Sequence, residues 1–170
     1  NSNGQLLHRY RDGEAGLPSH VDDYAFFTWG LLELYEAGLD VRYLRTAVEL
    51  NKDFIARFWD EAAGAFHFTA KEASDLPVPQ QEIYDGPVPA GNSVAMLNLL
   101  RLGRITANTY YEEKAHKIGS AFSGTVKHFP SAHTYLLTAI QFGLGPSYEV
   151  VIAGNPDSED TRNMLEHIRK

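Results

Sequence analysis

The residue types best suited to proton transfer gather in the segment SHVDDY, residues 19–24. His20, Asp22, Asp23 and Tyr24 place an imidazole, two carboxylates and a phenol close together along the chain. A carboxylate with such neighbours can act as a general acid or base on an oxygen or carbon of a sugar. Asp23 is therefore a candidate catalytic residue, with His20, Asp22 and Tyr24 as candidate substrate contacts. The competing interpretation is structural, because Asp22 or Asp23 would also cap a helix and stabilise its first turn.

A second polar cluster lies in the segment EIYDGPVPAGNS, residues 82–93. Its prolines and glycines restrict the backbone, so we expect an ordered loop that holds side chains in place before a helix. Asp85 is a candidate catalytic residue here, and Tyr84, Asn92 and Ser93 are candidate substrate contacts. In the structural alternative, Asp85 belongs to a turn and Asn92 caps the helix that follows.

His133, in the segment PSAHTY, completes the candidate catalytic set. Its imidazole titrates near neutrality and could shuttle a proton, although a hydrogen-bonded structural role is the alternative. Asp23 and Asp85 could form the acid and base pair of a glycosidase-like site if they face one cavity. The histidines show no His-x-x-x-His spacing, so we expect neither a metal site nor a cofactor.

An internal repeat indicates how these residues are positioned. The segment that begins at Leu31, LLELYEAGLDVRYLRTAVEL, matches the segment that begins at Leu99, LLRLGRITANTYYEEKAHKI, at an offset of 68 residues. Apolar positions correspond on both sides of one polar turn, with Asp40 matching Asn108. Such a repeat indicates a single supersecondary unit used twice.

Each unit is predicted to be a pair of helices. Residues 22–37 are apolar nearly all the way round, which is typical of a helix surrounded by protein, whereas residues 41–58 carry one apolar stripe and should lie outside. Residues 92–105 repeat the inner type and residues 110–127 the outer type. Residues 131–144 begin a third unit as another inner helix. Asp22 or Asp23, Asn92 and Ser131 are the expected caps, and residues 59–72 are expected to contain a β-hairpin.

Repeated inner and outer helices predict a mainly α fold, namely a fragment of a six-hairpin glycosidase-like α/α toroid. Six hairpins of this length would need about 400 residues, because neighbouring repeats must stack to bury a core. Residues 1–146 would then hold about two and a half hairpins. In residues 147–170 we expect a strand at SYEVVIAG followed by a helix, the start of a truncated region.

Composition narrows the classes of function. A net charge of -7 and a pI near 5.4 argue against a nucleic-acid partner. No apolar run is long enough to span a bilayer, so we expect no membrane partner and a cytoplasmic location. The absence of cysteine excludes disulfides and thiolate sites from these 170 residues.

Four segments, in this order along the chain, carry a family resemblance: DDYAFFTWGLLELYEA, FWDEAAGAFHFTA, YDGPVPAGNSVAMLNLLRLGRIT and SYEVVIAG. Together they resemble the later part of the helical region in the thioredoxin domain-containing YyaL family, whose vertebrate relatives are called spermatogenesis-associated protein 20. The resemblance implies an N-terminal thioredoxin-like domain outside this chain. It also implies a toroid similar to N-acylglucosamine 2-epimerases and six-hairpin glycosidases.

Two functions follow from these expectations. The first is a toroid segment that binds or processes a carbohydrate or polyol by acid/base chemistry, like a sugar epimerase, isomerase or glycosidase. The alternative is a non-catalytic helical scaffold or interaction module attached to the thioredoxin-like domain. A lanthionine-cyclase-like or terpene-cyclase-like toroid ranks last, because the zinc ligands and the aspartate-rich motif are missing. Expected partners are a sugar or polyol, the remainder of the full-length protein, and further copies that bind at open toroid edges.

Overall fold

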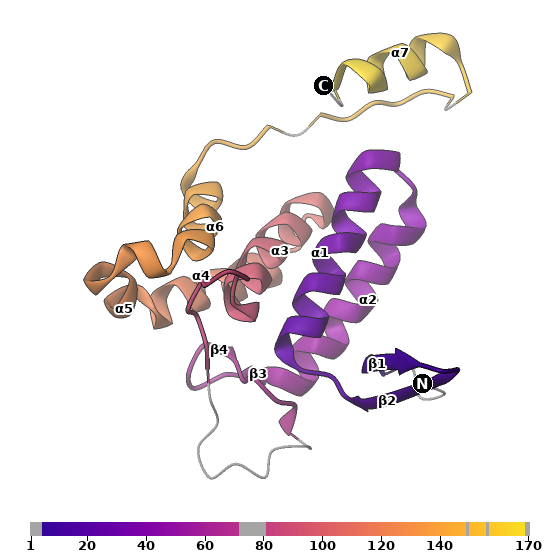
Figure 1. Ribbon diagram of the computed structural model, residues 1–170. Coiled ribbons are helices and arrows are strands. Elements are labelled where there is room, and N and C mark those ends of the chain that lie inside the picture. The colour runs from indigo at the N-terminus through magenta and orange to yellow at the C-terminus, as the bar shows by residue number, and fades with distance from the viewer. Residues whose placement is uncertain (1–4, 72–80, 149, 156, 169–170) are drawn as a thin grey trace.

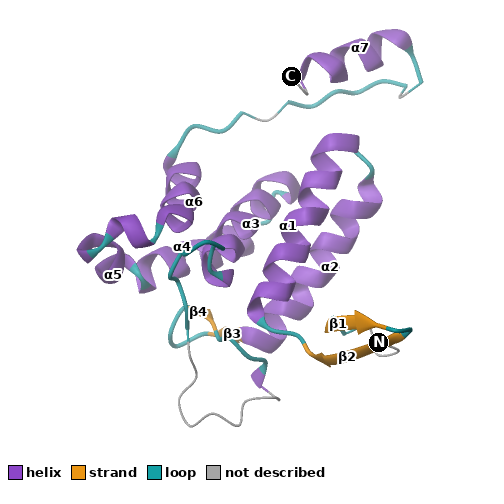
Figure 2. Cartoon of the chain, viewed as in Figure 1, coloured by secondary structure: helices purple, strands orange, loops and turns teal. Residues whose placement is uncertain are grey.

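Helices dominate the chain, and the strands are confined to short hairpins in the part that is described (Figure 1, Figure 2). The computed structural model describes residues 5–71, 81–148, 150–155 and 157–168. The predicted mainly α class is confirmed. The helices are α1 (Val21–Gly38), α2 (Val41–Phe58), α3 (Gly91–Thr106), α4 (Thr109–Ala121), α5 (Ser123–His128), α6 (Thr134–Leu144) and α7 (Glu159–Ile168), with a 3-10 turn at Pro130–Ala132.

The two copies of the 68-residue repeat end and begin their helices at equivalent residues. Leu39 and Ala107, which are repeat equivalents, both adopt a left-handed conformation, with φ of 54° and 52°, and end α1 and α3. Asp40 and Asn108 then cap α2 and α4 by accepting a hydrogen bond from the backbone two residues on. Each inner helix is thus joined to its outer helix by the same tight connection.

The inner helices α1 and α3 run in the same direction, side by side (Figure 1). At their beginnings, a Cβ added to Gly91 would stand 2.4 Å from Asp22 Oδ1, so the two helix ends are in direct contact. Toward their ends, Arg101 of α3 forms ion pairs with Glu33 and Glu36 of α1, each at 2.8 Å. Helix α6 packs on the opposite side of α3.

The core lies between the inner and outer helices. On α2 the buried side chains are Ala47, Asn51, Phe54 and Phe58, a single stripe as predicted, whereas α3 is buried over most of its length. Phe54 stacks on Phe66, with ring centroids 4.0 Å apart and planes 3° apart. Phe66 belongs to the predicted hairpin, which is confirmed as β3 (Trp59–Asp60) paired with β4 (Ala65–Phe66).

Several helix boundaries differ from the expectations. The N-caps of α1, α3 and α6 are His20, Ala90 and His133 instead of Asp22 or Asp23, Asn92 and Ser131. The first turns are satisfied by carboxylates at other positions, because Asp23 accepts from His20 N and Asp85 accepts from Ala90 N, Tyr135 N and Leu136 N. The predicted outer helix 110–127 breaks at Phe122 into α4 and α5, in a stretch rich in serine and glycine, which are weak helix formers.

The C-terminal unit contains the expected helix, α7. The apolar segment before it, residues 147–148 and 150–154, is extended but pairs with no strand among the described residues (Figure 1). A strand needs a neighbour to satisfy its backbone groups, and the described part of the chain places none beside this segment. In the described part of the chain, no helix combines the length and apolar character needed to cross a membrane.

A second hairpin, which the sequence analysis did not anticipate, precedes α1. It pairs β1 (Leu7–Arg11) with β2 (Glu14–Pro18), in the register Leu7 to Pro18 and Arg9 to Gly16. Its turn residues Asp12 and Gly13 have φ of 54° and 84°, and positive φ at both central residues is the signature of the tight turn that joins twisted strands. This hairpin brings β1 alongside the start of α1.

Glu61 holds the hairpin β3–β4 against α4. Its carboxylate accepts hydrogen bonds from Lys114 Nζ at 2.6 Å, from Lys117 Nζ and from Trp59 Nε1 at 2.6 Å. These bonds, first of all the one from Lys114, lower the pKa of Glu61 from 4.5 to about 2. The ionised form is therefore the one that the fold stabilises.

We predict that Glu61→Gln destabilises the protein at neutral pH and that the difference from wild type vanishes in acid. Because the folded pKa is depressed, the contribution of Glu61 is complete above about pH 4.5 and is lost as the pH falls toward 2. Urea unfolding of both proteins across this range measures the difference. Glu113→Gln, which removes an exposed acid of α4, is the control. A Glu61→Gln difference that stays constant from pH 5 to pH 2 would contradict the prediction.

Candidate functional site

The N-terminal ends of α1, α3 and α6 lie beside one another, and we call this edge of the molecule the rim. Most of the predicted site residues lie at the rim or in the loop before α3. Asp85 makes the junction between α3 and α6, and its side chain is buried. Its Oδ1 accepts from Ala90 N at 3.0 Å, and its Oδ2 accepts from Tyr135 N at 2.9 Å and Leu136 N at 3.0 Å. One carboxylate thus satisfies the backbone at the start of both helices.

Asn92 is not the cap of α3 that was expected, because the helix begins one residue earlier, at Gly91. Its buried side chain instead binds the hairpin β3–β4 and the loop before α3. Oδ1 accepts from Phe66 N at 2.9 Å, and Nδ2 donates to Phe66 O at 3.0 Å and to Glu82 O at 3.1 Å. Ser93 is fully buried, and its hydroxyl has no hydrogen-bond partner among the described residues.

His133 lies beneath the same loop, buried at the start of α6. Its Nδ1 is 2.8 Å from the carbonyl oxygen of Ile83, so in this arrangement Nδ1 carries the proton and donates it to that oxygen. Together with Asp85 and Asn92, it forms a buried polar layer whose partners are backbone groups. The tyrosine of this loop, Tyr84, is 58% exposed and faces solvent.

Asp23 forms the accessible part of the rim together with two imidazoles. Its Oδ2 accepts from His20 N at 2.8 Å, so Asp23 also fixes the first turn of α1. His8 Nδ1, from strand β1, lies 3.0 Å and 2.9 Å from the two carboxylate oxygens, and His20 Nδ1 lies 3.8 Å from Oδ2. The His20 ring stacks on Phe68, with centroids 4.9 Å apart.

The two neighbours of Asp23 in the predicted cluster point to different places. Asp22 lies against the start of α3, and burial raises its pKa, against the effect of a hydrogen bond from the Gly91 backbone. Tyr24 is fully buried and donates its hydroxyl proton to Asp53 of α2; burial, followed by this bond, raises its pKa. Tyr24 therefore lies in the interface between α1 and α2.

The structure thus sorts most of the predicted site residues into two groups, whereas Tyr24 lies between α1 and α2 and Tyr84 faces solvent. Asp22, Asp23 and His20 share the rim with solvent access, and His8 joins them. Asp85, Asn92, Ser93 and His133 form the buried layer. Their assignment as catalytic or substrate-binding residues stays a prediction. Local spacing could not reveal His8, but the Asp-Gly turn that folds its hairpin is a sequence signal that points to it.

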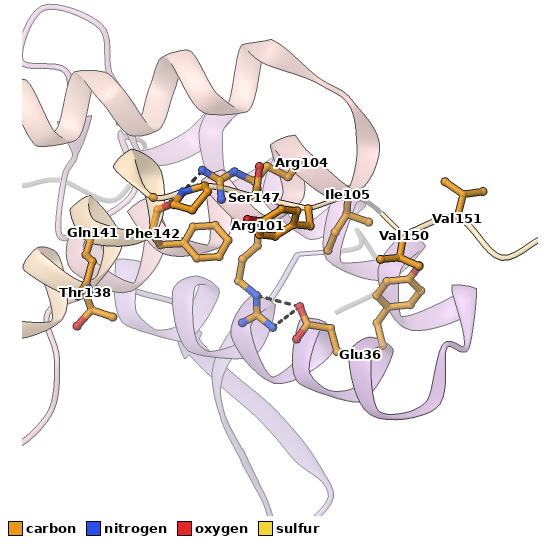
Figure 3. Close-up of a pocket in the computed structure, with 14 residues that line it drawn as sticks. Glu36, Arg101, Arg104, Ile105, Thr138, Gln141, Phe142, Ser147, Val150 and Val151 are labelled. Atoms are coloured by element: carbon orange, nitrogen blue, oxygen red, sulfur yellow. Dashed lines mark hydrogen bonds and ion pairs between the residues drawn. The ribbon is translucent and has the colours of Figure 1, made fainter. Parts of the chain in front are cut away.

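The opposite ends of the same helices border a cavity of about 880 Å³ (Figure 3). Its wall includes Tyr35 and Glu36 of α1, Arg101 and Arg104 of α3, and Phe142 of α6. Figure 3 shows the Arg101 guanidinium turned toward Glu36, so this charge is matched within the protein. Arg104 Nη2 donates to the carbonyl oxygens of Phe142 and Gly143 near the end of α6.

We predict that Asp85→Ala lowers the free energy of unfolding by about 3 kcal/mol or more. The change leaves buried N–H groups of two helices without an acceptor, and each hydrogen bond to a charged group contributes about 1.5–3 kcal/mol. Asp85→Asn keeps one acceptor oxygen and should cost less. Urea unfolding measures both, with Glu113→Gln as a control expected to change stability by less than about 0.5 kcal/mol. Wild-type stability in Asp85→Ala would be incompatible with the anchoring role.

Comparison with known proteins shows which sequences this chain is similar to. No family model matches the sequence. Spermatogenesis-associated protein 20 of Rattus norvegicus is 33% identical over 147 residues, which cover 86% of this chain and 19% of that protein. The Homo sapiens protein of the same name is 29% identical over 174 residues, covering 97% and 22%, and an uncharacterised Caenorhabditis elegans protein is 32% identical over 167 residues, covering 96% and 22%.

The chain spans about a fifth of the length of these relatives. The similarity extends over most of the 170 residues, including both helical repeats and the polar rim between them. The chain belongs to the family of spermatogenesis-associated protein 20 and YyaL.

Proposed function

We propose that the rim formed by the beginnings of α1, α3 and α6 binds a carbohydrate or related polyol. The observation that carries the proposal is the accessible group of Asp23, His8 and His20, which lies on this rim beside Asp22. Carboxylates and imidazoles are suited to sugar hydroxyl groups, because each can accept a hydrogen bond that a hydroxyl donates. The exposed ring of Tyr84 offers an apolar face for the C–H groups of a sugar.

In this proposal the two groups of rim residues have different roles. Asp23 is the carboxylate that contacts the substrate, and its position is fixed by the backbone of His20. Asp85 and His133, which the sequence marks as catalytic candidates, act as positioning residues, because their bonded atoms are engaged by backbone groups. An epimerase-like, isomerase-like or glycosidase-like reaction rests on similarity at the level of the fold.

A thermal-shift screen with sugars and sugar phosphates tests the binding proposal. A ligand that binds only the folded state raises its stability by about 2.7 kcal/mol at a concentration of 100 times the dissociation constant, so we expect a higher Tm with at least one sugar. Asp23→Asn should remove the shift, whereas Glu113→Gln should keep it. If turnover is then found in the longer family protein, wild-type turnover in Asp23→Asn would remove the catalytic assignment.

A second candidate function, a non-catalytic scaffold, is favoured by a separate observation. Two side chains of the second cluster that were expected to do chemistry, Asp85 and Asn92, make all their hydrogen bonds within the described residues to backbone groups. The three inner helices α1, α3 and α6 form a row, which we call the helix row. Apolar side chains are also exposed at both of its ends, with Phe27 and Leu34 on α1 and Leu144 at the end of α6. Such surfaces suit contact with further helices or further copies of the chain.

The scaffold proposal predicts self-association of the 170-residue chain. Light scattering should give a mass that rises with concentration above the 19.0 kDa of one chain. Phe27→Gln and Leu34→Gln, on one face of α1, should lower that mass, because they remove exposed apolar area from one end of the row. Tyr10→Gln removes an exposed ring from the hairpin β1–β2 and serves as the matched control. A monomer at every concentration would count against this candidate.

A further inference from the structure

We propose that His8, His20 and Asp23 form a binding site for one divalent transition-metal ion of the zinc type. The three side chains come from strand β1, from the residue before α1 and from the first turn of α1. One ligand atom from each can be chosen so that all three lie within 4.8 Å of one another. The inference goes beyond the proposed function, because binding of an ion requires no sugar.

The donor set suits a transition metal. Two imidazoles and one carboxylate on one side of an ion are ligands typical of zinc and of non-haem iron, with remaining positions open to water or substrate. Magnesium and calcium prefer sites made only of oxygen ligands. These three ligands should therefore favour zinc or iron over magnesium and calcium.

The distances bracket those that a metal requires. Ligand atoms at about 2.0–2.1 Å from a tetrahedral zinc ion lie about 3.3 Å from one another. His8 Nδ1 is 2.9 Å from Asp23 Oδ2, and His20 Nδ1 is 3.8 Å from the same oxygen. Small displacements of the His8 and His20 side chains would bring all three ligand atoms to the distances that an ion needs. The His8 side chain can move in this way because it is exposed.

The surroundings hold the ligands in place. The backbone of His20 donates to Asp23 Oδ2, which orients the carboxylate. The His20 ring stacks on Phe68, and residue 20 forms a β-bridge with Thr69. Contacts of this kind from outside the ligand set commonly orient metal ligands.

A hydrogen-bonded His8–Asp23 pair without metal affinity is the competing interpretation. The chain contains a matched example, in which His67 Nε2 lies 3.2 Å from Asp60 Oδ2 without belonging to a group of three ligands found among the described residues. If histidine and aspartate neighbours alone were sufficient, both pairs would attract an ion. The proposal assigns it to the group that includes the second imidazole.

Titration of the chelator-treated chain with Zn²⁺ tests the proposal, with heat and displacement from a chromogenic chelator as readouts. We expect one ion per chain, and Co²⁺ should give the visible absorption of a site with nitrogen and oxygen ligands. His8→Ala, His20→Ala and Asp23→Asn should each weaken binding by about tenfold or more, as loss of even outer contacts can do. His128→Ala, at an exposed histidine outside the group, should bind like wild type.

His8→Ala is the decisive variant, because His8 lies on the exposed hairpin and its loss should leave the helices intact. Circular dichroism verifies that the variants are folded. The proposal is overturned if wild type binds no stoichiometric Zn²⁺, or if folded His8→Ala binds it as tightly as wild type. If wild type shows a sugar-induced thermal shift but binds no Zn²⁺ in the titration, the metal site is overturned and the sugar proposal stands.

Discussion

The architecture depends on a buried carboxylate at the meeting point of two helices. The first turns of α3 and α6 carry backbone N–H groups that have no partner within their own helices. Asp85 accepts hydrogen bonds from Ala90, Tyr135 and Leu136 and so satisfies donors from both. Its negative charge also suits the positive ends of two helix dipoles. Without it, the parallel alignment of these helices would leave polar groups buried and unpaired.

Burial separates two uses of the same residue types. Aspartate and histidine occur both in the layer under the loop, at Asp85 and His133, and on the accessible rim, at Asp23 and His20. In the buried layer their partners are backbone atoms close to helix ends, so their effect is on geometry. On the rim, Asp23 meets the His8 side chain from another element and remains within reach of a ligand. The structure therefore concentrates candidate chemistry beside α1.

Much of the fold could be predicted because its signals are local and periodic. The limits of α2 match the predicted 41–58, and the offset of 68 reappears in the equivalent turns at Leu39 and Ala107. The errors concern residues whose partners are distant. Asn92 resembles a helix cap, yet its side chain binds Phe66, 26 residues away, and that partnership is invisible to local propensity.

The candidate site was harder to predict than the helices, because its members come from separate elements. Asp23 and His20 are neighbours in sequence, but His8 joins them only when the Asp12–Gly13 turn folds the hairpin β1–β2. Asp85 was correctly placed at the beginning of an inner helix, whereas its contact with α6 spans 51 residues. The spacing of residues within one segment cannot predict contacts between residues that are far apart in the sequence.

The tight contact between Gly91 and Asp22 has a mechanical consequence. Helix α3 has 16 residues and is about 24 Å long, and it is held at its beginning by α1 on one side and by Asp85 on the other. Its other end is held as well, because Arg101 forms ion pairs with Glu33 and Glu36 of α1 and Arg104 donates to two carbonyl oxygens of α6. The cavity beside Arg101 and Arg104 is therefore bordered by helices that are fixed to one another at both ends.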